Sequence, residues 1–182
     1  MELTKTISSK SDIIAALQTS FEDISTFIEN TPDEIFHQRH ENKWSIAENL
    51  DHLILSNKPL PSAFKRNKLF FLTFGFSFSG SENYETLKAN YHLKLNQDGP
   101  PPKNAFIPKG TNEISKETFQ ENWKRIGPKY APRLEKWSEK DLDRFRLPHP
   151  LLGKLTFREM LFFTIFHNEH HLRTMRSLKE VL

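Results

Sequence analysis

The sequence predicts an all-α fold, a four-helix bundle in one domain that spans residues 1–182. Long segments repeat apolar residues at the three-to-four-residue spacing of an amphipathic helix. Two of these segments begin with the S/T-x-x-E pattern of a helix capping box. Only 6 glycines occur in 182 residues, which argues against a sandwich or a barrel with many tight turns.

The first predicted helix lies within residues 9–34. Ser9 or Ser11 can cap its start, and Thr31 followed by Pro32 ends it. One face of the segment is apolar and the other is polar, as expected for a helix with one wet side. The apolar residues are Ile13, Ile14, Leu17, Phe21, Ile24, Phe27 and Ile28.

The second predicted helix runs from about Ile46 to Asn57. Ser45 followed by Glu48 is a capping box, which fixes where the helix begins. Pro59 comes shortly after the helix and kinks or breaks it, because proline lacks the backbone N–H that a helix interior needs.

An irregular segment rich in Phe and Pro separates the second and third helices, at residues 69–111. The alternation from Phe74 to Phe78 fits either a short strand or an apolar loop over a pocket. A short helix is expected over residues 83–93, and a Pro-rich loop over residues 97–110.

The third and fourth predicted helices complete the bundle. The third follows an apolar stripe over residues 115–137, with probable bends placed at Pro128 and Pro132. The fourth covers residues 157–179, and Thr156 begins its capping box. The first half of the fourth helix is apolar all round, so another segment or a second subunit must cover it.

Composition excludes several classes of protein. The chain has no cysteine, so disulfides, zinc–thiolate sites and a cysteine nucleophile are excluded. The net charge is only +3 and no long Lys/Arg block occurs, so nucleic acid is not expected as a partner. No secretory signal and no apolar run of membrane-spanning length is visible, so the protein is expected in the cytoplasm without a membrane partner.

The sequence HNEHH places three histidines on the fourth helix, at His167, His170 and His171. At about 100° per residue, all three fall on the inward side of the helix. A buried imidazole needs partners for its nitrogens, and a divalent metal can satisfy several rings at once. Two histidines four residues apart can reach one ion, but ordinary core histidines remain the alternative.

A further ligand for such an ion must come from another helix, because catalytic metal sites commonly have about three protein ligands. His52 is favoured because it borders the apolar face of the second helix. His37 and His40 are expected in a solvated linker, and His149, between two prolines, at the surface. The complete set of candidates is His37, His40, His52, His92 and His149.

Two segments together resemble the DinB/YfiT-like superfamily of metal-binding four-helix bundles. The first, KWSIAENLDHL, has the Trp-Ser start, the Glu three residues later and the His-Leu pair one turn further on. The second, LLGKLTFREMLFFTIFHNEHH, has the Gly, the capped helix and the H-x-x-H-H pattern. With the other two helices, the resemblance covers most of the chain.

The resemblance implies that His52, His167 and His171 hold one divalent metal ion. Zn or Ni is expected first, with Fe and Mn as alternatives, since three imidazoles suit all four. His170 would then lie beside the site as a catalytic candidate. Glu48 is a second catalytic candidate, although its role in the capping box is the competing explanation.

Members of this superfamily with known activities imply a metal-dependent S-transferase. Such an enzyme adds a low-molecular-weight thiol, such as bacillithiol, mycothiol or glutathione, to a small electrophilic substrate. A hydrolase that uses metal-activated water is the alternative, and a non-enzymatic metal-binding or stress protein, with a homodimer through its phenylalanines, is another. Thr174 stands where many members have Gln, and this difference bears on the substrate.

Overall fold

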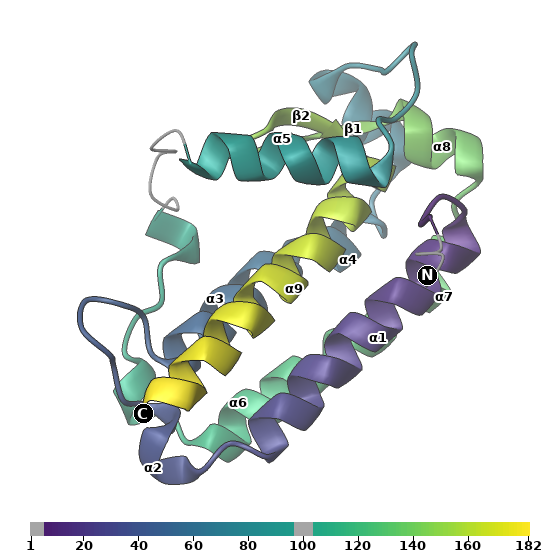
Figure 1. The fold of residues 1–182 in the computed structure, drawn as a ribbon. Helices are drawn as coiled ribbons and strands as arrows, with labels where there is room; N and C mark the ends of the chain where they lie inside the picture. The colour runs from purple at the N-terminus through teal and green to yellow at the C-terminus, as the bar shows by residue number, and fades with distance from the viewer. Residues whose placement is uncertain (1–5, 97–103) are drawn as a thin grey trace.

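The structure is a computed structural model that describes residues 6–96 and 104–182 (Figure 1). Four helices pack around the core: α1 (Lys10–Glu29), α3 (Ile46–Asn57), α6 (Lys116–Lys124) and α9 (Phe157–Val181). Helix α9 packs against both α1 and α3, and these two helices also pack against α6. The core of the molecule lies where their apolar faces meet.

Other elements surround these helices, so the molecule is mostly helical but is not a strict four-helix bundle. Helix α5 packs across the N-terminal half of α9, as Figure 1 shows near its top. The other helices and strands are α2 (Asp33–Phe36), α4 (Pro59–Ala63), α5 (Tyr84–Asn96), α7 (Ala131–Leu134), α8 (Glu139–Arg144), β1 (Arg146–His149) and β2 (Gly153–Thr156).

Capping side chains set the starts of the principal helices where the sequence predicts them. The Ser45 hydroxyl accepts the N–H of Glu48, and the Glu48 carboxylate accepts the N–H of Ser45, which completes the capping box. Thr156 and Glu159 form the same box at α9. These bonds satisfy backbone N–H groups that have no partner inside a helix.

The third predicted helix is divided into α6, a 3₁₀ turn η4 (Gly127–Lys129) and α7. Pro128 and Pro132 each lie in the first turn of a new short helix, where a missing N–H costs least. Gly127 also lies against α1, and a Cβ there would be only 3.0 Å from the ring of Phe21. The prolines therefore restart the helix rather than bend it.

A two-stranded antiparallel sheet makes the all-α prediction incomplete. Arg146 pairs with Thr156, and His149 pairs with Gly153 at the turn. Gly153 has φ +82°, a left-handed conformation that glycine adopts without strain. The second strand ends at Thr156, the residue that caps α9, so the hairpin delivers the chain directly into that helix.

The Phe-rich segment forms a 3₁₀ helix, η1 (Lys68–Phe74), followed by a single bridge between Phe76 and Phe145. Phe71 points inward and its ring centroid lies 4.8 Å from that of Phe157 at the start of α9. Together with α5, this segment covers the apolar first half of α9. The predicted helix over residues 83–93 is α5, whereas the first part of the predicted Pro-rich loop lies outside the described residues.

None of the helices within the described residues is long and apolar enough to span a membrane.

Candidate metal centre

Three histidines from two helices come together in the interior. His52 comes from α3, and His167 and His171 come from successive turns of α9. Each offers a ring nitrogen, and these three atoms lie within 4.8 Å of one another. All three side chains are buried. Among the described residues this is the one such cluster of potential metal ligands, and it is the set that the family resemblance implies.

Neighbouring groups fix which nitrogen of two rings carries the proton. The Nδ1 atom of His52 lies 2.7 Å from the carbonyl oxygen of Phe106, which can only accept, so this Nδ1 donates. The Nδ1 atom of His171 donates to Asn49 Oδ1 at 2.8 Å. The amide of Asn49 is oriented because its Nδ2 donates to two carbonyls at the N-terminus of α3. In the neutral rings of His52 and His171, Nε2 therefore carries no proton and has a free lone pair.

The spacing of the nitrogens suits a metal ion. His52 Nε2 and His167 Nε2 are 3.2 Å apart. Ligand bonds of about 2.0 Å in a tetrahedral site place two nitrogens about 3.3 Å apart. Metal-binding histidines usually donate their outward N–H to a carbonyl, a carboxylate or another polar group, which fixes the ring. The donor set therefore fits one divalent ion held by three imidazoles.

Burial keeps these rings neutral. It lowers the pKa of His167 and of His171 far below the ordinary value, and the neighbouring histidines lower both further. Burial also lowers the pKa of His52, against the opposing effect of its bond to Phe106. Neutral imidazole is the form that binds metal, so the site does not need to lose a proton at neutral pH.

The two catalytic candidates occupy different surroundings. Glu48 pairs with Arg39 through both carboxylate oxygens, and it also accepts the N–H of Ser45. Burial raises the pKa of Glu48, but the bonds from Arg39 and Ser45 outweigh it and hold the pKa low. His170 is half-buried beside the cluster, with its ring centroid 5.2 Å from that of His171.

The remaining histidines lie apart from the cluster. His149 was expected at the surface, but it is half-buried with its ring centroid 4.2 Å from that of Phe163. Its Nδ1 accepts the N–H groups of Leu151 and Leu152 in the hairpin turn, and burial lowers its pKa to about 4. The expectation fails because the hairpin folds His149 back onto α9. His37 is also half-buried and its Nδ1 lacks a partner, so only part of the linker is solvated.

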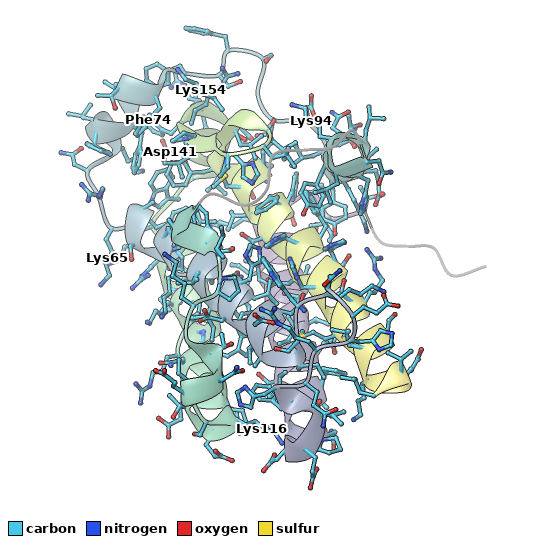
Figure 2. All side chains as sticks on the ribbon, turned by 90° about the vertical axis from the view of Figure 1, so that its left-hand side faces the viewer. Lys65, Phe74, Lys94, Lys116, Asp141 and Lys154 are labelled. Carbon is cyan, nitrogen blue, oxygen red and sulfur yellow. The ribbon has the colours of Figure 1, made fainter. Side chains whose placement is uncertain are left out.

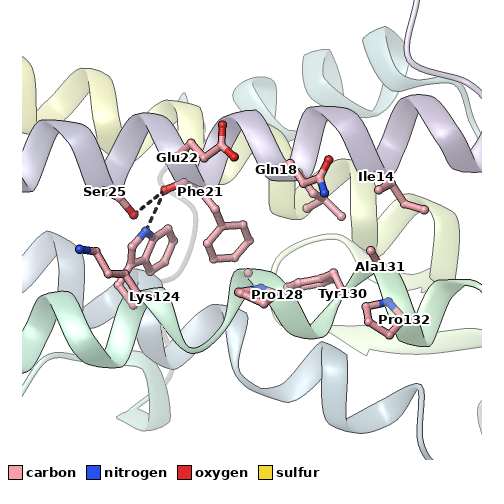
Figure 3. Close-up of a pocket in the computed structure, with 13 residues that line it drawn as sticks. Ile14, Gln18, Phe21, Glu22, Ser25, Lys124, Pro128, Tyr130, Ala131 and Pro132 are labelled. Atoms are coloured by element: carbon pink, nitrogen blue, oxygen red, sulfur yellow. Dashed lines mark hydrogen bonds between the residues drawn. The ribbon is translucent and has the colours of Figure 1, made fainter.

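A cavity of about 450 Å³ lies between α1 and the α6–α7 segment (Figure 3). Its wall includes the stacked rings of Phe21 and Trp123, and the Trp123 indole donates to the carbonyl of Phe21 at 3.1 Å. None of the three clustered histidines lines it. The cavity is mainly apolar and has no link to the histidine chemistry.

A second cavity, of about 510 Å³, lies beside the cluster and is here called the basic groove. It is formed by the linker before α3 and by the C-terminal half of α9, and no carboxylate lines it. Thr174, the residue that departs from the family pattern, is part of its wall. The lining residues are His40, Lys43, His170, Arg173, Thr174, Ser177, Leu178 and Val181.

Sequence reasoning missed the groups that support the cluster. Asn49 lies one turn before His52 on α3, and a buried amide on an apolar helix face was a signal that could have identified it. The ring of Trp44, the residue before the capping Ser45, lies 5.2 Å from that of His52. The carbonyl of Phe106 had no signal in the sequence, because only the fold brings it to α3.

The fold and the histidine cluster define a helical protein with a candidate metal centre. The chain belongs to the DinB superfamily, whose family model matches residues 16–175. No curated protein sequence matches the chain significantly.

Two solved structures have a similar fold. One is the colibactin self-resistance protein ClbS in complex with a dsDNA, with a TM-score of 0.58 and 14% identity over 96% of this chain and 98% of ClbS. The other is a DinB-like protein from Bacillus cereus ATCC 10987, with a TM-score of 0.54 and 17% identity over 96% of this chain and 93% of that protein. At these identities the likeness concerns the fold alone.

The exclusion of nucleic acid as a partner was wrong. A protein of similar fold was crystallised with dsDNA, so neither the fold nor a modest net charge excludes this class of ligand. The physical reason is that the prediction considered only clusters of positive residues that are close in the sequence. Lys43 and Arg173 are far apart in sequence, and only the fold brings them together in the basic groove.

Proposed function

We propose that the protein binds one divalent metal ion through His52, His167 and His171 and uses it to transfer a low-molecular-weight thiol to a small electrophile. The observation that carries the proposal is the convergence of one ring nitrogen from each of three buried histidines. In two of these rings the protonated Nδ1 is directed away from the cluster. Zn or Ni is the expected metal, and Fe or Mn would suit the same ligands.

The chemistry follows from neutral ligands. Three imidazoles leave a bound divalent ion its full charge, which lowers the pKa of a thiol or water bound to it. The chain has no cysteine, so a sulfur nucleophile must come from a cosubstrate. Asn49 and the Phe106 carbonyl hold two rings in place, which keeps the donor nitrogens directed toward a common point.

The carboxylates near the cluster favour thiol transfer over hydrolysis. A hydrolase needs a general base to take a proton from the attacking water. Glu48 is poorly suited to this role, because its carboxylate already accepts hydrogen bonds from Arg39 and from the N–H of Ser45. Glu169, on the other side of α9, pairs with Lys88 at 3.3 Å. A thiol bound as thiolate needs no such base during its attack.

The basic groove supports an anionic cosubstrate. Lys43 and Arg173 line it, and the nearby carboxylate of Glu41 lies 4.0 Å from His40. His170, which also lines it, lies next to His171 of the cluster. Low-molecular-weight thiols such as glutathione carry carboxylates, which these side chains would attract.

The test is turnover of chlorodinitrobenzene by metal-loaded protein, with glutathione, bacillithiol or mycothiol supplied in turn. Thiol-dependent turnover that is lost in His52→Ala and kept in Asn90→Ala is the expected result. Asn90 is an exposed amide on α5 and serves as the matched control. Ester hydrolysis without thiol would favour the hydrolase, and bound metal without turnover would leave a metal-binding or stress protein.

Binding of double-stranded DNA is a second candidate, favoured by the basic groove and by the dsDNA in the ClbS structure. Fluorescence anisotropy with a labelled duplex would show binding that weakens steeply with salt. Lys43→Gln with Arg173→Gln should weaken it and reduce the salt slope by about two. Lys124→Gln with Arg125→Gln at the C-terminal end of α6 removes the same charge elsewhere and should leave it nearly unchanged. Equal loss in both variants would mean that the groove is not the DNA site.

A further inference from the structure

The Phe-rich segment and its flanks form one end of the molecule, here called the apolar tip (residues 65–80 with Arg144). In Figure 1 it is the loop between α4 and α5, and in Figure 2 Phe74 and Asp141 mark this end while Lys116 marks the opposite one. Phe71 anchors the tip, because its ring packs against those of Phe157 and Trp137 in the core. The tip is thus fixed to the start of α9, about ten residues before the histidine cluster.

Several large apolar side chains of the tip face outward. Phe78 is 97% exposed, and Leu69 is 67% exposed. Phe70 and Leu72 are 44% and 41% exposed. A folded protein gains nothing in water by presenting Phe at the end of a loop, so such a cluster indicates a contact with another apolar surface.

Positive charges surround these apolar side chains. Lys65, Arg66 and Arg144 are exposed, and none of them forms an ion pair within the described part of the chain. The guanidinium carbon of Arg66 lies 4.9 Å from the ring centroid of Phe70, and that of Arg144 lies 5.6 Å from the ring centroid of Phe76. Each arginine therefore lies directly over an aromatic ring of the tip.

Two acids of the adjoining helix α8 are paired with other cations. Asp141 pairs with Lys68 at 2.6 Å, and Asp143 pairs with Arg158 at 2.5 Å. Both acids are thus neutralised by other cations. The tip combines exposed apolar side chains with free positive charge, which is the composition of a site that binds an interface of anionic lipid.

We propose that the apolar tip docks on a lipid surface that contains anionic headgroups. Phe78 and Leu69 would enter the boundary between headgroups and acyl chains, and Lys65, Arg66 and Arg144 would face the phosphates. This proposal departs from the expectation that the chain has no membrane partner. That expectation was based on the absence of a spanning segment, and surface docking needs none.

A second copy of the chain fits the tip less well. The four exposed side chains present on the order of 500 Å² of apolar surface, less than the roughly 800 Å² per partner of a standard interface. In a twofold dimer each patch meets itself, so Lys65, Arg66 and Arg144 would face the same charges. The predicted homodimer through the phenylalanines is therefore disfavoured at this surface.

An acidic peptide is also a poorer occupant. Peptide recognition usually requires a groove or an open sheet edge, whereas Phe78 projects from a loop. Neither of the two cavities described above is lined by a residue of the tip. A projecting side chain suits a soft surface that it can enter.

The test is co-sedimentation of the full chain with vesicles of phosphatidylcholine, alone or mixed with phosphatidylglycerol. Binding to the mixed vesicles that weakens with salt is expected, with little binding to phosphatidylcholine alone. Phe78→Ser should reduce the partition coefficient about tenfold. Lys65→Gln and Arg66→Gln should reduce it about fivefold each. These residues are exposed, so the variants should keep the fold, as circular dichroism would verify.

Leu93→Ser is the matched control, since Leu93 is 58% exposed on α5 and outside the tip. It should leave vesicle binding unchanged, and an equal loss with this variant would overturn the proposal. Failure to bind mixed vesicles at low salt would also overturn it. So would light scattering that finds a dimer in the parent and a monomer in Phe78→Ser, because the tip would then be a protein interface. The result does not depend on the metal centre, which this assay does not use.

Discussion

His167 and Asn168 are consecutive residues on α9, both are buried, and their surroundings differ in kind. The Asn168 amide donates to Ser20 at 3.3 Å and accepts from Asn57 at 3.0 Å, so protein side chains satisfy both ends. The hydroxyl of Tyr130 adds a bond to the carbonyl of Asn57. Within the described residues, only Asn57 Oδ1 of this asparagine cluster lacks a hydrogen-bond partner.

In the histidine cluster, protein groups outside the cluster bind only its outer side. Asn49 and Phe106 use the Nδ1 protons of His171 and His52, and the Nε2 atoms face one another. The Nε2 atoms of His52 and His167 are 3.2 Å apart, and either a proton on His167 Nε2 or a cation can lie between them. A buried polar group whose hydrogen bonds are all made within the protein indicates a structural role. A group of buried side chains with lone pairs directed at a common point indicates a binding site for a ligand.

Removing two of the metal ligands should have the largest effect on metal binding. The parent should retain about one equivalent of metal after desalting, and the double variant His52→Ala, His171→Ala should retain almost none, because one imidazole cannot hold the ion. Elemental analysis of untagged protein measures this. Asn168→Ala is the matched control, since it alters a buried polar residue on the same helix and should keep the metal. Equal metal content in the parent and the double variant would place the ion elsewhere.

Changing the support of a ligand should have a smaller effect. Asn49→Ala leaves all three imidazoles in place but removes the acceptor for the Nδ1 proton of His171. Metal affinity should fall about 10- to 100-fold, as is typical when such an outer partner is lost. Competition with a chromogenic chelator gives the affinity. An unchanged affinity would mean that Asn49 serves only to brace the first turn of α3.

The helices that carry the site were predictable because their signals are local. Ser45 with Glu48, and Thr156 with Glu159, set the starts of α3 and α9 within a single turn. The HxxxH spacing indicated that His167 and His171 share a helix face. Patterning also favoured His52 among five candidates, because it borders the apolar face of α3. The choice of His171 over His170, in contrast, depended on the resemblance to the family.

The parts that failed depend on contacts between distant segments. Strands β1 and β2 have four residues each, too few for a clear alternation, and they form because the chain must return to the start of α9. His149 looked exposed until that hairpin placed it against Phe163. Likewise, no pattern in the sequence could associate the carbonyl of Phe106 with His52, because tertiary structure alone joins them.

The asparagine cluster should matter for stability and not for metal. Asn168→Ala removes the partner of the Asn57 amide in the core and should lower the free energy of unfolding by about 2 kcal/mol. Urea unfolding in the presence of a chelator measures this without a contribution from bound metal. Asn90→Ala, an exposed amide, should change it by less than about 0.5 kcal/mol. A large loss of metal in Asn168→Ala would remove the distinction between the two clusters.

Helix α9 also carries a buried charged residue, Arg158, which can be compared with His167 and Asn168. Arg158 is buried and binds Glu139 at 2.5 Å and Asp143 at 2.5 Å. Burial raises the pKa of both acids, but the hydrogen bonds and the charge of Arg158, together with bonds from Lys10 to Glu139 and from Ser81 to Asp143, lower the pKa overall. A carboxyl whose pKa is lower in the folded state stabilises the fold above its unfolded pKa, near 4, and loses that contribution as pH falls through the folded value.

The parent should therefore lose stability as the pH falls below about 4, and Arg158→Met should reduce that dependence. The contribution is expected to be less than about 1 kcal/mol, because both acids are partly exposed and solvent screens the pairs. Urea unfolding at a series of pH values, with chelator present, measures the slope. Asn168→Ala should keep the slope of the parent, since its cluster has no titrating group. An unchanged slope in Arg158→Met would mean that other groups, the buried histidines or the remaining carboxylates, cause the acid sensitivity. Arg158 would then resemble the asparagines in serving only to fill and bond the interior.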